Sequence, residues 1–377
     1  MSRSSHKEDF FQTTASIEES GRRAAKAKNE HGKPIRLQSK ILAVAEDPYS
    51  AGSVYVAESA GSVRKVALET GETLALYRGP TAPLTSIAFS PDGKLLFAGC
   101  WDKTVWSWGL QSKQSGQKYD GHSDFVKAVT CARINDGRHV LISGGADSKI
   151  IIFDIANGEK LHVFKDHSMG IQDLRIDPIT LQEGSLSIDL FSAGSDREIR
   201  QFSILSSGNA TASAANPLIA HETSVYKLHF DEDGDLWTAS ADKYAKCLTR
   251  DSGWQPNLAL EHPDFVRDVV VYEQGGWVVT ACRDEEIRVW NKATGELYHT
   301  YTGHFEEVTG LVLVGNTVVS VSIDATVRQW SLHPSELQKA KEEALNKKNT
   351  AEEPPKQESM LTEEEERELA ELMGEDE

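Results

Sequence analysis

The sequence predicts an all-β protein whose main body is a seven-bladed β-propeller. Three observations carry this prediction: a repeat of about 42 residues, strand-like periodicity inside each copy, and turn signals between the strands. Six copies carry an aspartate just before an apolar strand, at spacings of 40 to 49 residues. These aspartates are Asp102, Asp147, Asp196, Asp242, Asp284 and Asp324. A seventh, degenerate copy has Gly61 in the place of the aspartate.

The periodicity inside each copy is that of short strands. The segment VVSVSID, followed by ATVRQWSL, alternates apolar and polar residues on both sides of a tight turn. Turn signals such as SPDGK at 90–94 and DEDGD at 231–235 recur where strands must reverse. Because no helical pattern separates the strands, parallel α/β folds are excluded. One small sheet cannot bury both of its faces, but seven sheets around an axis can.

The residues that accompany these aspartates resemble the WD40-repeat family, over about three quarters of the chain. Gly121-His122 and Gly303-His304 match the family's Gly-His dipeptide, and Trp290 and Trp330 each stand six residues after an aspartate. The resemblance implies that a histidine, a strand hydroxyl, the turn aspartate and the tryptophan form a hydrogen-bonded set inside each blade. Carried over to this sequence, the sets are His122, Ser143 and Asp147; His167, Ser192 and Asp196; His221, Thr238 and Asp242; His262, Thr280, Asp284 and Trp290; and His304, Ser320, Asp324 and Trp330. The first two copies lack the full set, so their blades need another source of rigidity.

A recurring His, Ser or Thr, and Asp invites a catalytic interpretation. Nucleophilic catalysis needs such a set once, at a pocket, whereas here it recurs five times. Buried polar groups must be paired, so we interpret these sets as structural. No common nucleotide-binding, hydrolase or metalloprotease motif is present. We therefore expect no enzyme, no catalytic residues, no metal site and no cofactor.

The family resemblance also implies how the ring closes. In such propellers the outermost strand of the last blade comes from the start of the chain, and residues 33–39 contain the apolar segment placed to supply it. The alternative is that Ile35 and Leu37 simply begin the first blade. We expect three segments: a flexible polar and basic arm at 1–32, the propeller at 33–332, and an acidic, helical or disordered tail at 333–377.

Binding residues are expected on the face where the loops after the histidines meet the turns that hold the aspartates. Family positions on this face carry over to Trp101, Phe125, Lys127, Tyr226, Phe265, Arg267 and Arg283. Aromatic residues and arginine dominate interface energetics when they are desolvated, and a basic rim would attract an acidic peptide segment. The alternative is that the phenylalanines fill strand packing and that the cations are ordinary solvated charges.

The charge distribution favours protein partners over nucleic acid. The net charge is −18, and residues 41–332 carry −13 of it, so nucleic acid is expected to bind indirectly or weakly. The four cysteines form no CxxC pair, and no apolar run is long enough to span a bilayer. We expect an intracellular protein of the cytoplasm, the nucleus or both, without membrane contact, that acts as a monomer within a hetero-complex.

The acidic tail contains a second candidate binding element. Thr362 and Glu365 form a capping-box pattern before an acidic turn, and Gly374 offers a stop. In the helix that this pattern predicts, Leu369, Leu372 and Met373 share one face, which is suited to a partner's groove. The alternative is a solvated acidic tail.

These observations favour a non-catalytic scaffold or adaptor that binds proteins through this face and the tails. Two alternatives remain: an RNA-associated subunit of an RNA-processing or ribosome-assembly complex, and a propeller hydrolase or metal-dependent enzyme with a cluster of carboxylates or histidines in its channel.

Overall fold

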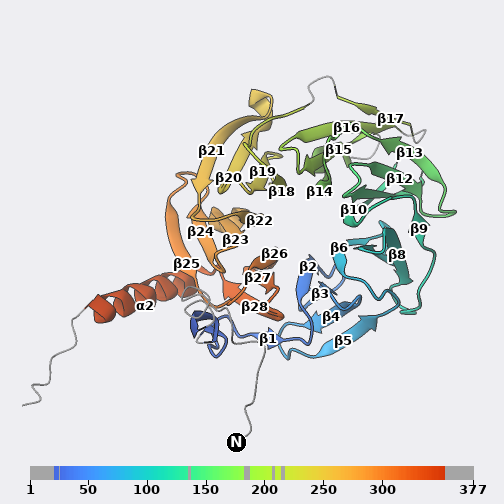
Figure 1. Cartoon of the computed structure of the whole chain (residues 1–377). Coiled ribbons are helices and arrows are strands. Elements are labelled where there is room, and N and C mark those ends of the chain that lie inside the picture. The colour runs from blue at the N-terminus through green and yellow to red at the C-terminus, as the bar shows by residue number, and fades with distance from the viewer. Residues whose placement is uncertain are drawn as a thin grey trace, which may run out of the picture. The chain divides into compact units, whose positions relative to one another are not determined.

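The computed structural model describes residues 21–24, 26–134, 137–181, 187–205, 209–213 and 217–352, with side chains up to residue 346. Contacts divide the chain into two units, Met1–Pro334 and Ser335–Glu377. The first unit contains seven four-stranded antiparallel sheets arranged in a ring, as predicted (Figure 1). Helix α2 (Pro334–Glu352) begins at the boundary between the two units and is consistent with the helical alternative expected for the tail at 333–377.

The sheets follow one another along the chain, and each is called a blade. The strands are β2 (Ile41–Glu46), β3 (Ser53–Glu58), β4 (Val63–Ala67) and β5 (Thr73–Tyr77) in blade 1; β6 (Leu84–Phe89), β7 (Leu95–Cys100), β8 (Thr104–Gly109) and β9 (Tyr119–Asp120) in blade 2; β10 (Val126–Arg133), β11 (His139–Gly145), β12 (Ile150–Asp154) and β13 (Lys160–Phe164) in blade 3; and β14 (Ile171–Ile176), β15 (Ser187–Gly194), β16 (Ile199–Leu205) and β17 (Ala210–Ala212) in blade 4.

The remaining strands are β18 (Val225–Phe230), β19 (Leu236–Ser240), β20 (Tyr244–Thr249) and β21 (Gln255–Glu261) in blade 5; β22 (Val266–Tyr272), β23 (Trp277–Cys282), β24 (Ile287–Asn291) and β25 (Leu297–Tyr301) in blade 6; and β26 (Val308–Val314), β27 (Thr317–Ser322), β28 (Thr326–Ser331) and β1 (Ile35–Arg36) in blade 7. Three short 3-10 helices lie in loops, at Pro178–Leu181, Arg250–Ser252 and Glu273–Gly275. No helix in the described part of the chain combines the length and apolar character needed to cross a membrane.

The hydrophobic core lies between neighbouring blades. One cluster combines Val140 and Ile142 of blade 3 with Leu190 and Phe202 of blade 4, and the side chains of all four are fully buried. Each sheet thus covers one face with the blade before it and the other face with the blade after it, which a single sheet could not achieve.

The first described strand closes the ring. Strand β1 pairs antiparallel with β28, with Ile35 opposite Val327 and Arg36 opposite Thr326 (Figure 1). Ile35 and Leu37 pack against the apolar cluster shared by blades 7 and 1. Blade 7 therefore consists of three strands from the end of the propeller and one from its start, and blade 1 begins at Ile41 instead.

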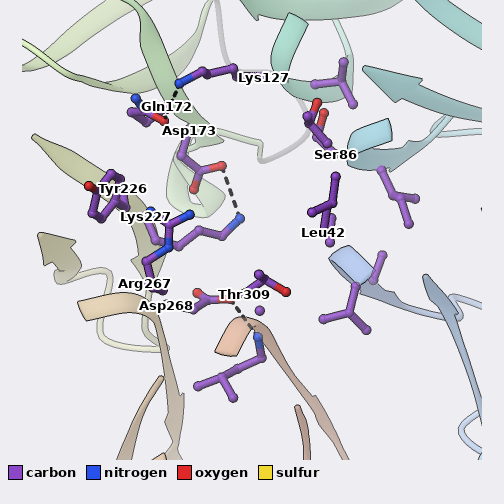
Figure 2. Close-up of a pocket in the computed structure, with 18 of the residues that line it drawn as sticks. Leu42, Ser86, Lys127, Gln172, Asp173, Tyr226, Lys227, Arg267, Asp268 and Thr309 are labelled. Carbon is purple, nitrogen blue, oxygen red and sulfur yellow. Dashed lines mark hydrogen bonds and ion pairs between the residues drawn. The ribbon is translucent and has the colours of Figure 1, made fainter. Parts of the chain in front are cut away.

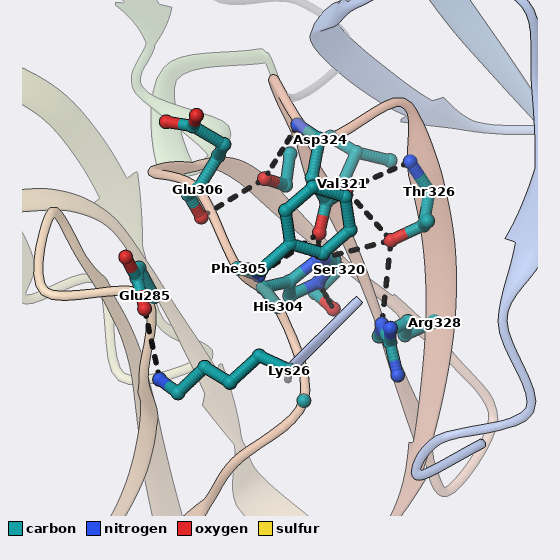
Figure 3. A network of polar contacts seen from close by, with 12 residues as sticks. Lys26, Glu285, His304, Phe305, Glu306, Ser320, Val321, Asp324, Thr326 and Arg328 are labelled. Atoms are coloured by element: carbon teal, nitrogen blue, oxygen red, sulfur yellow. Dashed lines mark hydrogen bonds and ion pairs between the residues drawn. The ribbon is translucent and has the colours of Figure 1, made fainter. Parts of the chain in front are cut away.

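Hydrogen bonds join the repeat histidine, hydroxyl and aspartate in blades 3, 4, 5 and 7. In blade 7, Nδ1 of His304 lies 2.8 Å from Oδ2 of Asp324, and its Nε2 lies 2.7 Å from Oγ of Ser320 (Figure 3). The indole nitrogen of Trp330 donates to the same hydroxyl at 2.8 Å. Equivalent bonds of 2.7 to 3.0 Å join His122 with Ser143 and Asp147, His167 with Ser192 and Asp196, and His221 with Thr238 and Asp242.

The protonation of these sets follows from their burial. Burial lowers the pKa of His304, so its neutral ring donates from Nδ1 to the carboxylate and accepts the hydroxyl proton at Nε2. Burial also acts to raise the pKa of Asp196 and Asp242, but the interactions with their histidines and two backbone hydrogen bonds together outweigh it and hold each pKa at about 2. Each network ties a loop to a hairpin turn within its blade.

Blade 6 departs from the set that the resemblance implied. The expected bond between His262 and Asp284 does not form, because Nδ1 of His262 lies 3.0 Å from a backbone carbonyl and Asp284 pairs with Arg288 through two bonds. The positive guanidinium is a stronger partner for the carboxylate than a neutral imidazole. Thr280 still joins His262 to the indole of Trp290, at 2.7 and 2.8 Å.

The first two blades use other polar contacts at the corresponding turn. In blade 2 the indole nitrogen of Trp106 donates to Oδ2 of Asp102 at 2.7 Å. In blade 1 the buried Glu58 accepts hydrogen bonds from Ser62 and Arg64. These contacts supply the rigidity that the sequence pattern left unexplained.

We predict that Asp324→Ala and Asp284→Ala differ in cost, although they change equivalent positions. Losing Asp324 leaves the buried Nδ1–H of His304 without its acceptor, which should lower the free energy of unfolding by about 1 to 3 kcal/mol. Asp284 has no bond to its histidine but pairs with Arg288, so its loss should cost less when it is made in an Arg288→Ala background, where no guanidinium is left unpaired. Urea unfolding of both variants measures the difference, with the exposed Asp251→Ala as the control. Equal losses at the two positions would contradict the difference between blades 6 and 7.

We also predict a loss of stability in mild acid that depends on His262. Burial, and then the charge of Arg288, lower the pKa of His262 from 6.5 to about 4. In the unfolded chain His262 is therefore protonated below about pH 6.5, whereas in the folded chain it is protonated only below about pH 4. The free energy of unfolding therefore falls as the pH is lowered through this window. His262→Gln should flatten this slope by about 1.4 kcal/mol per pH unit at most, as measured by urea unfolding across the window. An unchanged slope would contradict the prediction, and the exposed His333→Gln is the matched control.

Candidate functional site

A β-bulge opens every innermost strand of the propeller. In all seven blades the pairing with the second strand skips one residue near the start of the innermost strand. A bulged residue makes no ladder bonds, so its side chain can be aimed away from the sheet. The seven bulged residues are Leu42, Thr85, Lys127, Gln172, Tyr226, Arg267 and Thr309, and we call this ring the channel mouth.

All seven residues of the channel mouth line one cavity of about 440 Å³ on the axis of the ring (Figure 2). The first strand of each blade starts where its second strand ends, so the histidine loops and the aspartate turns lie on the same side as the channel mouth. We call this side the histidine face. It is the face on which the sequence placed the candidate binding residues.

Two cations of the channel mouth face each other across blades. Lys127 makes one hydrogen bond to a described residue, from Nζ to Oε1 of Gln172 at 3.2 Å. Burial, and then the nearby charge of Arg267, lower the pKa of Lys127. Arg267 lies 2.6 Å from Oε1 of Glu307, and its guanidinium covers the ring of Tyr226 at 4.3 Å. Lys127 thus has no carboxylate within ion-pair distance among the described residues, and an anion brought to this position would relieve its repulsion from Arg267.

Two carboxylates lie one residue further along the strands, below the channel mouth. Asp173 accepts a hydrogen bond from the backbone of Leu228 in the next blade, and Lys227 lies 3.4 Å from it (Figure 2). Asp268 accepts from the backbone of Leu311 at 2.8 Å, and burial raises its pKa. Both carboxylates join one innermost strand to the next, so we assign them to holding the blades together.

The aromatic candidates fall into two groups on the histidine face. Trp101 and Phe125, from blades 2 and 3, stack with their ring centroids 4.9 Å apart, and they are 42% and 37% exposed. Phe265 lies under the guanidinium of Arg283 at 5.1 Å and 6.5 Å from the ring of Tyr226. Lys127 and Arg267 lie at the channel mouth between the two groups. The structure thus places all seven candidates on this face.

Some members of this surface escaped the sequence reasoning. In five blades the bulged residue stands five positions after the repeat histidine, as Lys127 does after His122. The same offset leads from His167 to Gln172 and from His304 to Thr309, neither of which was singled out. Exposed apolar Met169, two residues after His167, was missed as well, because no pattern marks it.

The described residues offer two groups that have the composition of a metal site. One is His167, Asp196 and Glu198, in which the histidine and the aspartate already belong to the hydrogen-bonded set of blade 4. The other is Asp231, Asp233 and Glu273. The ammonium of Lys292 lies about 3 Å from carboxylates of all three residues, so a cation already occupies the position between them. Neither group therefore indicates a metal.

Outside the propeller, the tail candidates Leu369, Leu372 and Met373 lie beyond the described residues.

Comparison with known proteins adds an independent line of evidence. The model of the WD domain, G-beta repeat, matches residues 71–109, 113–154, 254–291 and 295–331. An uncharacterised WD repeat-containing protein of Schizosaccharomyces pombe is 31% identical over 341 residues, which are 86% of this chain and 89% of that protein. A U3 small nucleolar RNA-associated protein 15 homolog of Xenopus tropicalis is 25% identical over 56% of this chain and 39% of its own length. Mitochondrial division protein 1 of Vanderwaltozyma polyspora is 24% identical over 61% of this chain and 29% of its own length.

The repeats, the seven blades and the relative that matches along most of its length agree, and the chain belongs to the WD repeat family.

Proposed function

We propose that this protein is a non-catalytic scaffold that binds an acidic segment of a protein partner at the channel mouth. The observation that carries the proposal is the pair Lys127 and Arg267, which line one cavity from the bulges of blades 3 and 6, close enough for the charge of Arg267 to lower the pKa of Lys127. A carboxylate or another anion inserted there would offset the positive charges of Lys127 and Arg267, which are already partly desolvated. The propeller carries a net negative charge, so these two cations make the channel mouth a local positive site that favours an anionic ligand.

The aromatic groups on either side give such a segment an apolar surface to lie against. Trp101 and Phe125 present a flat, exposed stack, and Met169 is exposed on the adjoining loop of blade 4. Aromatic anchors beside a charged centre are the arrangement that concentrates binding energy at protein interfaces. The partner is therefore expected to carry apolar residues next to its acidic ones.

The scaffold proposal is supported by the state of the His, Ser and Asp sets. Each hydroxyl that would serve as a nucleophile is fully buried in blades 3, 4 and 7, and it is bonded to its own histidine. A nucleophile must reach substrate, so these sets are suited to bracing turns. We propose that the protein acts inside the cell, as a member of a multiprotein complex.

A second candidate function is suggested by one comparison. The Xenopus relative that is named as U3 small nucleolar RNA-associated matches 56% of this chain. An RNA-associated role in a processing or ribosome-assembly complex, and with it a nuclear location, is therefore the alternative. The acidic body favours an indirect association through protein.

The test of the channel mouth is peptide selection. A displayed library of random peptides panned on the full chain should enrich sequences that contain Asp or Glu beside apolar residues. Lys127→Ala with Arg267→Ala should weaken binding of the enriched peptides at least about tenfold, as measured by fluorescence anisotropy. The control is Arg133→Ala with Lys160→Ala, which removes the same charge from exposed sites away from the cavity. Peptides without acidic residues, or equal affinities for the two double variants, would overturn the proposal.

The RNA alternative predicts a different result. Filter binding of a structured RNA at two salt concentrations should show steeply salt-dependent affinity if the protein contacts phosphates directly. We expect weak binding under both conditions. Tight and salt-sensitive binding that is lost in Lys127→Ala with Arg267→Ala would replace the peptide proposal with an RNA site at the channel mouth.

A further inference from the structure

A second charged surface lies on the histidine face, over blades 6 and 7. Glu285 and Glu286 stand in the turn between β23 and β24, and Glu306 lies in the loop that follows His304. We call these three residues the acidic platform. It carries the opposite charge to Lys127 and Arg267 of the channel mouth.

The chain's own basic segment occupies this platform. Nζ of Lys26 lies 2.8 Å from Oε2 of Glu285 and 2.8 Å from Oε1 of Glu286 (Figure 3). Arg22 pairs with Glu285 at 2.9 Å, and Arg23 pairs with Glu306 at 2.9 Å. Arg22 and Lys26 stand at positions i and i+4, which are neighbours on one side of a helix, and Arg23 follows Arg22 directly. The structure therefore contains the platform together with a bound ligand of defined chemistry.

The two central carboxylates are buried beneath that segment. The side chains of Glu285 and Glu286 are 5% and 16% exposed. Burial acts to raise the pKa of Glu286, and Lys26 opposes that effect. Arg288, which is close by in blade 6, is bonded to Asp284 and so is not the partner of either carboxylate. A buried carboxylate needs a cation, and within the described residues the basic segment supplies it.

The basic segment is attached independently of the closure of the ring. Residues 29–32 form a separate anchor on blade 7, where the buried Arg328 donates to Oδ1 of Asn29 and to the backbone carbonyl of His31. The backbone of Gln329 also donates to the carbonyl of Gly32 at 2.7 Å. The sequence predicted a flexible arm over residues 1–32, and the structure instead fixes this part of it against blade 7.

The basic segment itself is attached through side-chain ion pairs, of which those made by Lys26 are the more buried. Arg22 and Arg23 remain more than a third exposed, and exposed ion pairs contribute little and are screened by salt. The segment also precedes the anchor, so its release breaks no strand pairing. It can leave the platform while β1 stays paired with β28.

We propose that the acidic platform is a binding site for a basic peptide segment of a partner protein, and that Arg22, Arg23 and Lys26 occupy it in the free protein. The partner's segment carries two or three Arg or Lys residues that one helical turn brings to the same side. A tethered occupant acts at an effective concentration on the order of millimolar, so it hides the site from weak competitors. This site is distinct from the channel mouth, and its ligand has the opposite charge.

The experiment compares the full chain with a variant in which the segment is neutralised. A fluorescent peptide of residues 21–28 should bind the triple variant Arg22→Ala, Arg23→Ala, Lys26→Ala at least about tenfold more tightly than it binds the unchanged chain, because the internal competitor is gone. Adding Glu285→Gln and Glu286→Gln to the triple variant should abolish this binding. Adding Glu69→Gln and Glu72→Gln, which remove the same charge from an exposed turn of blade 1, should leave it intact.

Each other result overturns the proposal. Equal affinity of the peptide for the unchanged chain and the triple variant would show that the segment does not occupy a binding site. Binding that survives Glu285→Gln with Glu286→Gln, or is lost equally with Glu69→Gln and Glu72→Gln, would place the peptide elsewhere. Failure of the triple variant to bind at low salt would show that the platform is only a structural contact. Circular dichroism and urea unfolding identify variants that do not fold. If the variant with both Glu285→Gln and Glu286→Gln does not fold, Glu285→Gln alone is added to the triple variant instead.

Discussion

The pairing of β1 with β28 is the constraint on which the rest of the structure depends. A blade covers its faces only with its two neighbours, so an open ring would leave two sheets with an exposed apolar face. Two residues of β1 complete the last sheet, and the anchor around Asn29 and Arg328 holds the chain that leads to them. Closure also fixes the axis. Seven innermost strands must begin around one opening, which determines where their first side chains can point.

The proposed binding site depends on how those strands begin. A regular strand would direct alternate residues into the neighbouring blade, where a lysine or an arginine would have to be desolvated and paired. The bulge removes one residue from that alternation, so Lys127 and Arg267 reach the cavity and the apolar residues before them stay buried. The same device in all seven blades separates the residues that hold the ring together from the residues that are free to bind.

The sequence repeat determined how much of the fold and of the candidate site could be predicted. The seven blades depend on spacing that a single sequence displays, whereas the closing strand and the histidine sets of blades 3, 4, 5 and 7 were implied by the family resemblance. Asp284 did not follow the pattern, because Arg288 competes for its carboxylate from the next strand, and a repeat alignment does not weigh such partners. The bulges were also hidden, because the consecutive buried residues Val269, Val270 and Val271 in β22 leave no strict alternation that an extra residue would visibly interrupt. The contact of Lys26 with Glu285 joins positions 259 residues apart, and no local sequence pattern indicates it.

The two charged surfaces of the histidine face affect each other through the field that they share. While Arg22 and Lys26 neutralise Glu285 and Glu286, Lys127 of the channel mouth has no carboxylate within ion-pair distance among the described residues, and an acidic segment is attracted. Lys26 is also among the charges that lower the pKa of His304, so its field reaches into blade 7. If a partner's basic segment displaced Lys26 without replacing all of its contacts, carboxylates would be left unpaired on the same face. Their negative field would weaken the attraction of the channel mouth for an acidic ligand, over distances up to roughly a Debye length of 10 Å. A partner that carries an acidic and a basic segment in one chain can bind the channel mouth and the acidic platform at the same time. If the two segments belong to separate ligands, the affinity of each ligand depends on how completely the other ligand neutralises the charge of the second surface.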